Sequence, residues 1–208
     1  MKHFNKYNII LWDFDGVIMD SMPIRDSGFE QVLKEYPTAQ VAELLNFHRT
    51  QGGLSRYVKF RHFFEDIRKE EISEKKVQTL ANRFSEIMLE NLINSEYLIT
   101  DSLDYIKKNY QKQIFHIVSG SDEKELNKIC SGLNIDIYFK SIQGSPTPKN
   151  QLVADILKNN NYNSKEVCLI GDSINDLEAA QVNDIDFFGY NNADLKEKSN
   201  NYIDSFNS

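Results

Sequence analysis

The chain of 208 residues is long enough for one α/β domain, or for a core domain with a smaller companion. Its charged and hydrophobic fractions, 26% and 40%, are those of an ordinary globular protein and argue against wholesale disorder. The net charge of −7 argues against a nucleic-acid-binding protein, and no segment reaches the roughly 20 apolar residues of a membrane span.

The first predicted element is a short buried strand at residues 8–14. Acidic residues follow this apolar run within a few positions, so the segment lacks the long apolar region and the cleavage site of a signal peptide. The two cysteines, Cys130 and Cys168, offer neither a disulfide framework nor a metal-binding spacing. We therefore expect a cytoplasmic protein.

Residues 17–96 show helical periodicity, for example at Leu80 and Phe84, and no convincing strand interrupts them. A helical block placed directly after the first strand would overhang the carboxyl end of the sheet, where open α/β folds bind ligands. We predict a helical cap domain over residues 17–96 and a Rossmann-like catalytic core built from residues 1–16 and 97–208.

Beyond the helical block, short apolar runs alternate with helical stretches, which is the pattern of repeated βα units and a parallel sheet. The predicted fold class is α/β: a Rossmann-like parallel sheet with a helical cap inserted after the first strand. The further strands are predicted at residues 114–119, 137–142, 167–170 and 186–190. The helices between them are predicted at residues 102–110, 122–132, 149–159 and 174–181.

The first strand ends in two aspartates, Asp13 and Asp15, followed by Gly16. Residues two apart on a strand point to the same side, so both carboxylates leave from one face, and Gly16 lets the chain turn. Carboxylates this close repel each other unless a cation lies between them or one is protonated. One group could then attack a substrate while the other exchanges protons. Taken alone, the pattern also fits a turn with solvated acids.

Two further strand ends carry groups suited to an anion. Ser119 and Gly120 precede a predicted helix, whose free N–H groups and the serine hydroxyl can bind an oxyanion together, although a simple helix cap is the alternative. Lys149 stands at the start of the next helix, where a cation is electrostatically misplaced unless an anion lies nearby. We interpret Lys149 as facing a phosphate or the Asp13 carboxylate rather than as a solvated surface lysine.

The next apolar strand ends in Gly171 and Asp172, and Asp176 follows near the start of a helix. Hard divalent cations prefer carboxylates, and Mg²⁺ typically uses one or two of them together with water and phosphate oxygens. Helix capping by Asp172 is the alternative. Both aspartates are therefore candidate metal ligands.

In order and spacing, these motifs resemble the four motifs of the haloacid dehalogenase superfamily, in particular its members with a small helical cap, such as phosphoglycolate phosphatases and β-phosphoglucomutases. The resemblance covers essentially the whole chain. It implies that Asp13 attacks phosphorus to form an aspartyl-phosphate, and that Asp15 protonates the leaving oxygen and then activates water. The implied phosphate-binding residues are Ser119, Gly120 and Lys149. The implied ligands of Mg²⁺ are the Asp13 carboxylate, the Asp15 carbonyl oxygen, Asp172 and Asp176.

Within the superfamily, the chain resembles hydrolases more than mutases or dehalogenases. Asp15 is the second aspartate that dehalogenating members lack. Arg25 stands where similar mutases carry a histidine that helps to suppress hydrolysis, and the pair Gly171-Asp172 replaces their Glu-Asp pair. These differences favour hydrolysis of a phosphate ester.

The stretch 53–56 looks like the substrate-specificity loop of the mutase branch. We interpret Lys59 and Arg61 individually as part of a solvated basic helix face. His48 and His62 could be ordinary surface histidines. The predicted substrate-binding residues of the cap are Arg56, Arg49 and Arg25.

We therefore predict a Mg²⁺-dependent phosphatase for a small phosphorylated metabolite, because a closing cap excludes water and could not admit a phosphoprotein. A sugar or polyol phosphate is favoured over phosphoglycolate. A phosphomutase of the β-phosphoglucomutase type and a catalytically silent binding protein are the alternatives. No nucleic-acid or membrane partner is expected, and the chain is predicted to be a monomer or a weak dimer. In the Asn-rich tail, Ile203 and Phe206 are possible anchors to the core.

Overall fold

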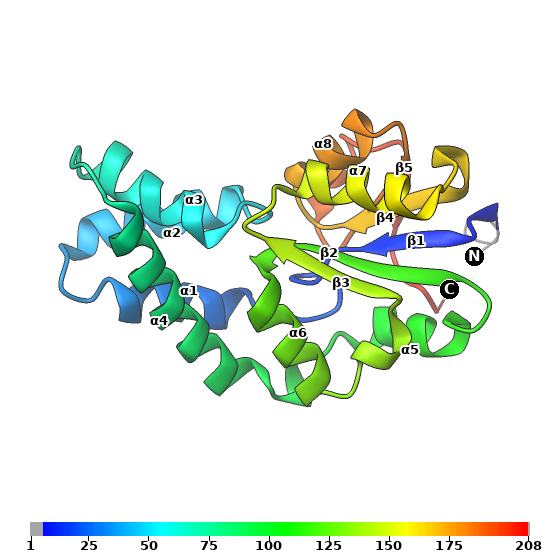
Figure 1. The fold of residues 1–208 in the computed structure, drawn as a ribbon, viewed down its shortest axis with the longest axis horizontal. Coiled ribbons are helices and arrows are strands. Elements are labelled where there is room, and N and C mark those ends of the chain that lie inside the picture. Colours follow the sequence, from blue (N-terminus) through cyan, green and yellow to red (C-terminus); the bar gives the residue numbers. More distant parts are fainter. Residues whose placement is uncertain (1–5, 208) are drawn as a thin grey trace.

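In the computed structural model, which describes residues 6–207, six parallel strands form one sheet, and a group of helices lies beyond one end of it (Figure 1). The order of the strands is β3-β2-β1-β4-β5-β6. The chain therefore adds β2 and β3 on one side of β1 and then β4, β5 and β6 on the other. The strands are β1 (Ile9–Trp12), β2 (Ile114–Asp122), β3 (Ser141–Ser145), β4 (Val167–Gly171), β5 (Asp186–Tyr190) and β6 (Tyr202–Ile203). This architecture confirms the predicted α/β, Rossmann-like fold class.

The central strand β1 is apolar at every position because both of its faces are covered by helices. Its side chains alternate: Ile10 and Trp12 belong to one hydrophobic cluster, and Ile9 and Leu11 belong to another. The first face is covered by α5 (Thr100–Asn109) and α6 (Glu123–Gly132), and the second by α7 (Lys149–Asn160) and α8 (Ile174–Val182).

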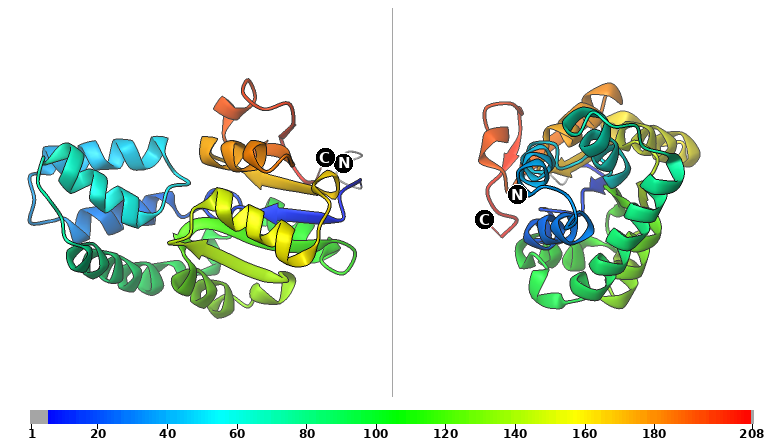
Figure 2. Two further views of the ribbon diagram at one scale, coloured as in Figure 1. Left: turned by 45° about the horizontal axis from the view of Figure 1, so that its top comes forward. Right: turned by 90° about the vertical axis from the view of Figure 1, so that its left-hand side faces the viewer.

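Between β1 and β2 the chain forms a helical insert, which we define as residues 22–92. The insert lies beyond the carboxyl ends of the strands (Figures 1 and 2). Its core contains a ring cluster in which Phe29 lies with centroid distances of 5.4 Å from Phe60 and 4.5 Å from Phe84. The elements of the insert are α1 (Met22–Val32), α2 (Thr38–Thr50), α3 (Arg56–Arg61), the π-helix His62–Ile67 and α4 (Glu74–Leu92).

The two segments that connect the insert to the sheet run next to each other. Met19 and Leu98 form an isolated antiparallel bridge. The Ile99 N–H donates to the Ile18 carbonyl over 2.9 Å, and the Asp20 N–H donates to the Tyr97 carbonyl over 2.8 Å. The insert is therefore attached through one small paired region.

Three details of the sheet differ from the sequence predictions. The third strand was expected at 137–142, but residues Asp136–Tyr138 form a 3-10 turn and β3 begins at Ser141, because the apolar Ile137 lies on the surface with 68% exposure. β2 extends three residues beyond the predicted 119, with an irregular register between Val118 and Asp122. β6 was not predicted at all.

The C-terminal segment docks on the core. β6 pairs with β5, and Ile203 and Phe206 are both buried. The Phe206 ring lies 5.4 Å from the Trp12 ring and 5.0 Å from the Tyr190 ring, measured between centroids. Both proposed anchors are therefore part of the core.

Two findings bear on the predictions from composition. Cys130 and Cys168 are buried free thiols. In the part of the chain that the structure describes, no helix combines the length and apolar character that a membrane crossing requires.

His116, buried in β2, leads to a prediction about acid stability. Its ring nitrogens contact Ser141 Oγ and Tyr162 Oη, and burial together with the nearby Lys140 lowers its pKa to about 4 from 6.5. Because the unfolded chain binds more protons between these two pH values, the free energy of unfolding should fall as the pH falls from 6.5 to 4, by about 3 kcal/mol from this group.

Urea unfolding of wild type and His116→Gln at pH 7 and pH 4.5 checks this. The variant should lose less stability on acidification, because it lacks the contribution of His116. His48, which is also buried with a lowered pKa, contributes equally to both proteins. An equal loss in the two proteins would contradict the assignment.

Candidate active site

The site begins where β1 ends. Asp13 follows β1, its N–H donates to the Ile170 carbonyl over 2.9 Å, and its side chain is almost fully buried. Lys149, the first residue of α7, donates from Nζ to Asp13 Oδ1 over 2.7 Å. The same ammonium group forms a buried ion pair with Asp176. The lysine at the positive end of a helix thus faces two carboxylates.

Asp13, Asp172 and Asp176 form an acidic cluster in which one ligand atom from each lies within 4.8 Å of the others. Asp172 approaches Gly16 so closely that a Cβ atom at position 16 would overlap its carboxylate, and Gly16 has a φ of 75° that favours glycine. Burial and the neighbouring Asp176 raise the pKa of Asp13 to about 7, although Lys149 opposes this shift. Burial and the Asp13 carboxylate likewise raise the pKa of Asp172 well above its usual value.

Asp176 also determines how α8 begins. Ser173 is the N-cap of this helix, and it forms a capping box with Asp176: the Ser173 hydroxyl donates to Asp176 Oδ2 over 2.7 Å, and the Ser173 N–H donates to the same oxygen over 3.0 Å. The other carboxylate oxygen binds Lys149. Helix capping and membership of the acidic cluster are therefore compatible roles of one side chain.

The carboxylate of Asp15 is held apart from this cluster by three donors. Arg25 Nε donates to Asp15 Oδ1 over 2.6 Å, Ser21 donates to the same oxygen, and Ser121 Oγ donates to Oδ2 over 2.6 Å. Burial alone would raise the pKa of Asp15, but Arg25 and the two serine hydroxyls outweigh it and hold this pKa below its usual value. Asp15 is therefore an ionised carboxylate in this arrangement.

The irregular part of β2 supplies Ser119 and Gly120. Ser119 is buried, and its hydroxyl accepts the Ser121 N–H over 3.1 Å. A Cβ atom at Gly120 would collide with the carbonyl oxygen of Gly53 in the helical insert. Glycine at position 120 therefore allows the insert to touch the sheet directly above the site.

A buried network of ion pairs joins the insert to α6. Glu125 receives two hydrogen bonds from Arg56, of which the one from Nη2 to Oε1 measures 2.8 Å, and a third from Arg25 Nη1 over 3.3 Å. Because Arg25 also binds Asp15, the network runs from α3 through Glu125 to the end of β1. Two of the three arginines predicted to bind substrate, Arg25 and Arg56, are thus already paired with carboxylates.

Three other basic residues of the insert, Arg49, Lys59 and His48, lie in different surroundings. Arg49 is more than half exposed at the rim of the site and pairs with Asp26. The interpretation of Lys59 as part of a solvated helix face was wrong, since its side chain is only 3% exposed. His48, for which an ordinary surface position was considered, is 2% exposed, and both residues line a cavity beneath the insert. The cause is the packing of α2 and α3 against α1 and α4, which a basic composition does not reveal.

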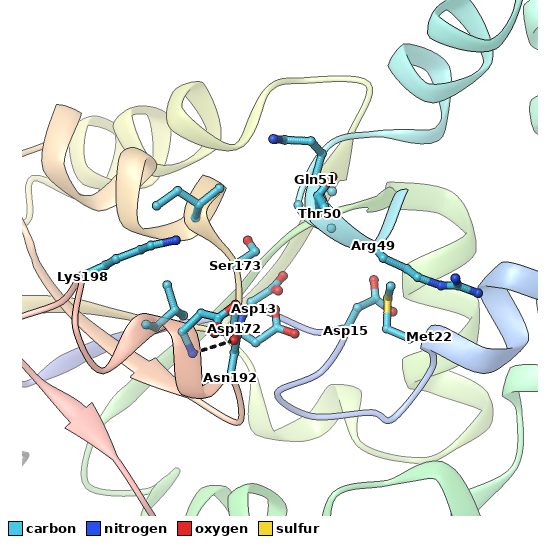
Figure 3. A pocket seen from close by; sticks show the side chains of 16 residues that line it. Asp13, Asp15, Met22, Arg49, Thr50, Gln51, Asp172, Ser173, Asn192 and Lys198 are labelled. Carbon is cyan, nitrogen blue, oxygen red and sulfur yellow. Dashed lines mark hydrogen bonds between the residues drawn. The ribbon is translucent and has the colours of Figure 1, made fainter. Parts of the chain in front are cut away.

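These groups surround a cavity of about 470 Å³ between the insert and the sheet. In Figure 3, Asp13 and Asp172 lie together, Asp15 lies to one side of them next to Met22, and Lys198 lies on the other side. Arg49 and Gln51 belong to the insert. Asn192 donates to the backbone carbonyl of Asp172 over 2.7 Å.

The sequence patterns did not single out every residue that acts in the site. Ser21, Ser121, Glu125 and Asn192 all contact a predicted site residue. Ser121, two positions after Ser119, carried a weak signal because it lies next to the predicted oxyanion motif. The other three contact the site through long-range packing that no local pattern marks.

Comparisons with known proteins bear on the family and the fold of the chain. A profile of haloacid dehalogenase-like hydrolases matches residues 10–190. No curated protein matches the sequence. Among solved structures, the chain resembles a predicted phosphoglycolate phosphatase from Haemophilus somnus, with a TM-score of 0.77 and 20% identity over 97% of this chain and 95% of the other.

Two other solved structures show the same likeness. β-Phosphoglucomutase from Clostridium difficile gives a TM-score of 0.77 at 18% identity, covering 97% of this chain and 92% of the other. The HAD-hydrolase YfnB from Bacillus subtilis, bound to magnesium, gives 0.71 at 17% identity, covering 97% and 96%. At such identities the likeness shows a shared fold and leaves the substrate open.

Proposed function

This chain belongs to the haloacid dehalogenase-like hydrolases, and we propose that it is a Mg²⁺-dependent phosphatase acting on a small phosphorylated metabolite. The observation that carries the proposal is the buried Asp13 carboxylate, paired with Lys149 and next to Asp172, at the wall of a cavity between the insert and the sheet. A nucleophilic carboxylate, a cation for the phosphoryl oxygens and further acids in one pocket fit phosphoryl transfer.

In the proposed reaction, an Asp13 carboxylate oxygen forms a bond to phosphorus as the bond to the ester oxygen breaks. The departing oxygen takes its proton from the protonated Asp15 carboxyl, and water then hydrolyses the aspartyl-phosphate, giving a proton to the resulting Asp15 carboxylate. Arg25 holds Asp15 ionised, which is the form that accepts this proton. Donation to the leaving oxygen requires Asp15 to gain a proton first, against the field of Arg25.

The acidic cluster fits a divalent cation. Asp13 and Asp176, both buried, pair with the one ammonium group of Lys149, and the partly buried Asp172 lies next to them. Burial, together with the neighbouring carboxylates, raises the pKa values of Asp13 and Asp172. Mg²⁺ prefers such oxygen ligands, and when bound it would neutralise charge on the phosphoryl group. The Asp13 and Asp172 carboxylates, with Asp176 nearby, would hold it.

The helical insert supports a small substrate. Gly53 of the insert contacts Gly120 of the sheet, and the partly open cavity of about 470 Å³ is within the size range of small-molecule sites. A folded phosphoprotein could not enter this space without removing the insert. The chain also shares its fold with a β-phosphoglucomutase, so a mutase is the second candidate. The hydrolase is favoured because Arg25, which stands where similar mutases carry a histidine that helps to suppress hydrolysis, binds the proton-transferring Asp15.

The test is phosphate release from a panel of phosphorylated sugars, polyols and small acids, with Mg²⁺ or with EDTA. We expect release that depends on Mg²⁺ and disappears in Asp13→Asn. Isomerised product without phosphate release, in the presence of a bisphosphate activator, would overturn the hydrolase in favour of the mutase. Absence of any turnover would leave a binding role.

Mg²⁺ should also stabilise the fold without any substrate. At a concentration of about 100 times its Kd, Mg²⁺ should add about 2.7 kcal/mol, which is about 5–10 °C in Tm for a chain of this size. Asp172→Asn should lose most of this shift. Asp194→Asn, which changes an exposed acid that lines the same cavity, serves as the control and should keep it. A shift that survives in Asp172→Asn would place the ion elsewhere.

A further inference from the structure

The chain turns directly after β5, and two consecutive asparagines of this turn reach the neighbouring strand ends. Asn192 Nδ2 donates to the backbone carbonyl of Asp172 over 2.7 Å, and Asn191 Nδ2 donates to the backbone carbonyl of Gly16 over 3.0 Å. Asp172 follows β4, and Gly16 follows the two aspartates at the end of β1. The turn after β5 therefore holds the backbone of two loops that carry candidate metal ligands.

The backbone of this turn and its own hydrogen bonds fix both amides. Asn191 has a φ of 54°, in the left-handed region that asparagine adopts more readily than most residues. Asn192 is the N-cap of the 3-10 turn Ala193–Leu195, and its Oδ1 accepts the Asp194 N–H over 3.1 Å. Because the oxygen is used by this donor, the amide nitrogen is the atom that meets the Asp172 carbonyl.

The turn is also anchored beyond the asparagines. The Gly189 N–H of β5 donates to the Asn201 carbonyl over 3.0 Å, directly before β6. Ser199 Oγ donates to the Leu195 carbonyl over 2.8 Å, which ties together the segment between the turn and β6. A turn that is held on both sides can keep a neighbouring loop at a defined position.

The Asp172 carboxylate depends on its backbone for this position. The carboxylates of Asp13 and Asp176 are both held by Lys149. Within residues 6–207, no side chain and no backbone N–H donates to the carboxylate of Asp172, which the charge of Asp13 repels. Its place beside Asp13 therefore relies on the backbone to which Asn192 is bonded.

An uncharged donor suits this task. The Asn192 amide fixes the backbone without bringing a positive charge to the acidic cluster, so the negative charge that attracts a divalent cation is preserved. A lysine or an arginine at this position would compete with the metal for the carboxylates. Groups that hold metal ligands from behind commonly change metal affinity by about 10- to 100-fold when they are replaced.

We propose that Asn192 is a positioning residue of the metal site. Through the Asp172 backbone carbonyl, it holds the Asp172 carboxylate close enough to Asp13 for both to bind one cation. The inference rests on the proposed function for the statement that a cation binds there. It makes the turn after β5, which no sequence motif marks, a part of the active site.

The test is calorimetric titration of the full chain with Mg²⁺ in the absence of substrate, so that no turnover is needed. Asn192→Ser keeps an oxygen that can cap the 3-10 turn, but its side chain is too short to reach the Asp172 carbonyl as well. The Kd for Mg²⁺ should rise by about tenfold or more. The Tm in EDTA should fall by about 2–4 °C at most, since one hydrogen bond is lost, and this measurement shows that the variant folds.

Asn163→Ser is the matched control. Asn163 is likewise the N-cap of a 3-10 turn, Ser164–Glu166, and its Oδ1 accepts the Lys165 N–H over 3.1 Å. It lies before β4, however, whereas Asp172 follows that strand. This variant should bind Mg²⁺ as wild type does.

An unchanged Kd in Asn192→Ser, or an equal rise in the control, would overturn the positioning role, and so would a wild type that binds no Mg²⁺. A weaker Kd confined to Asn192→Ser, in a protein that releases no phosphate from the panel, would keep the positioning role and reject the phosphatase. Phosphate release that depends on Mg²⁺, with the same Kd in wild type and in Asn192→Ser, would do the reverse.

Discussion

Asp13→Asn is expected to lower kcat by a factor of about 10⁴ or more while leaving the fold intact. An amide at this position cannot form the aspartyl-phosphate, and Asp176, which is bound by Ser173 and Lys149, is not free to replace it. Steady-state phosphate release on the best substrate of the panel measures the effect.

The same substitution should not destabilise the protein. Because burial raises the pKa of Asp13 to about 7, its ionised form is disfavoured in the folded state, and the cost is present above that pH. The Tm of Asp13→Asn at pH 8 should therefore equal or exceed that of wild type. Residual turnover within tenfold of wild type, in protein free of the wild-type form, would reject the nucleophile.

Glu125→Ala is expected to lower the free energy of unfolding by about 3–5 kcal/mol. Glu125 is the common partner of Arg56 and Arg25, and its removal leaves two buried guanidinium groups short of an acceptor. The effect should be large because the ion pairs are desolvated, in contrast to pairs at the surface. Urea unfolding measures it.

The matched control is Glu90→Ala, an exposed glutamate on α4, which should change stability by less than about 0.5 kcal/mol. Glu125→Gln, which keeps an acceptor oxygen, should lie between wild type and Glu125→Ala. If Glu125→Ala and the control lose similar amounts, the network contributes little to holding the insert on the sheet.

The sequence was sufficient to predict the elements that carry local signals. Asp13 and Asp172 each follow an uninterrupted apolar run, and in a parallel sheet such strand ends meet at one edge. Lys149 was marked by its charge at a helix start, and the structure places it against Asp13. The predicted bounds of the helical cap, 17–96, remain a prediction.

What could not be predicted depends on contacts between distant residues. Arg56 and Glu125 are 69 positions apart, and Lys59 lies on a short helix whose basic composition resembles a solvated surface. The burial of His48 likewise follows from the packing of the insert rather than from its neighbours in sequence. The third strand was placed too early because the exposed Ile137 imitates a core position.

The bridge between Met19 and Leu98 makes the two ends of the insert meet at one point. Changes of length or sequence within residues 22–92 therefore need not alter the register of any strand, and the aspartates at the strand ends keep their positions. The insert is therefore a module that can change in length and sequence, and with it the choice of substrate, while the groups of the proposed phosphoryl chemistry keep their geometry.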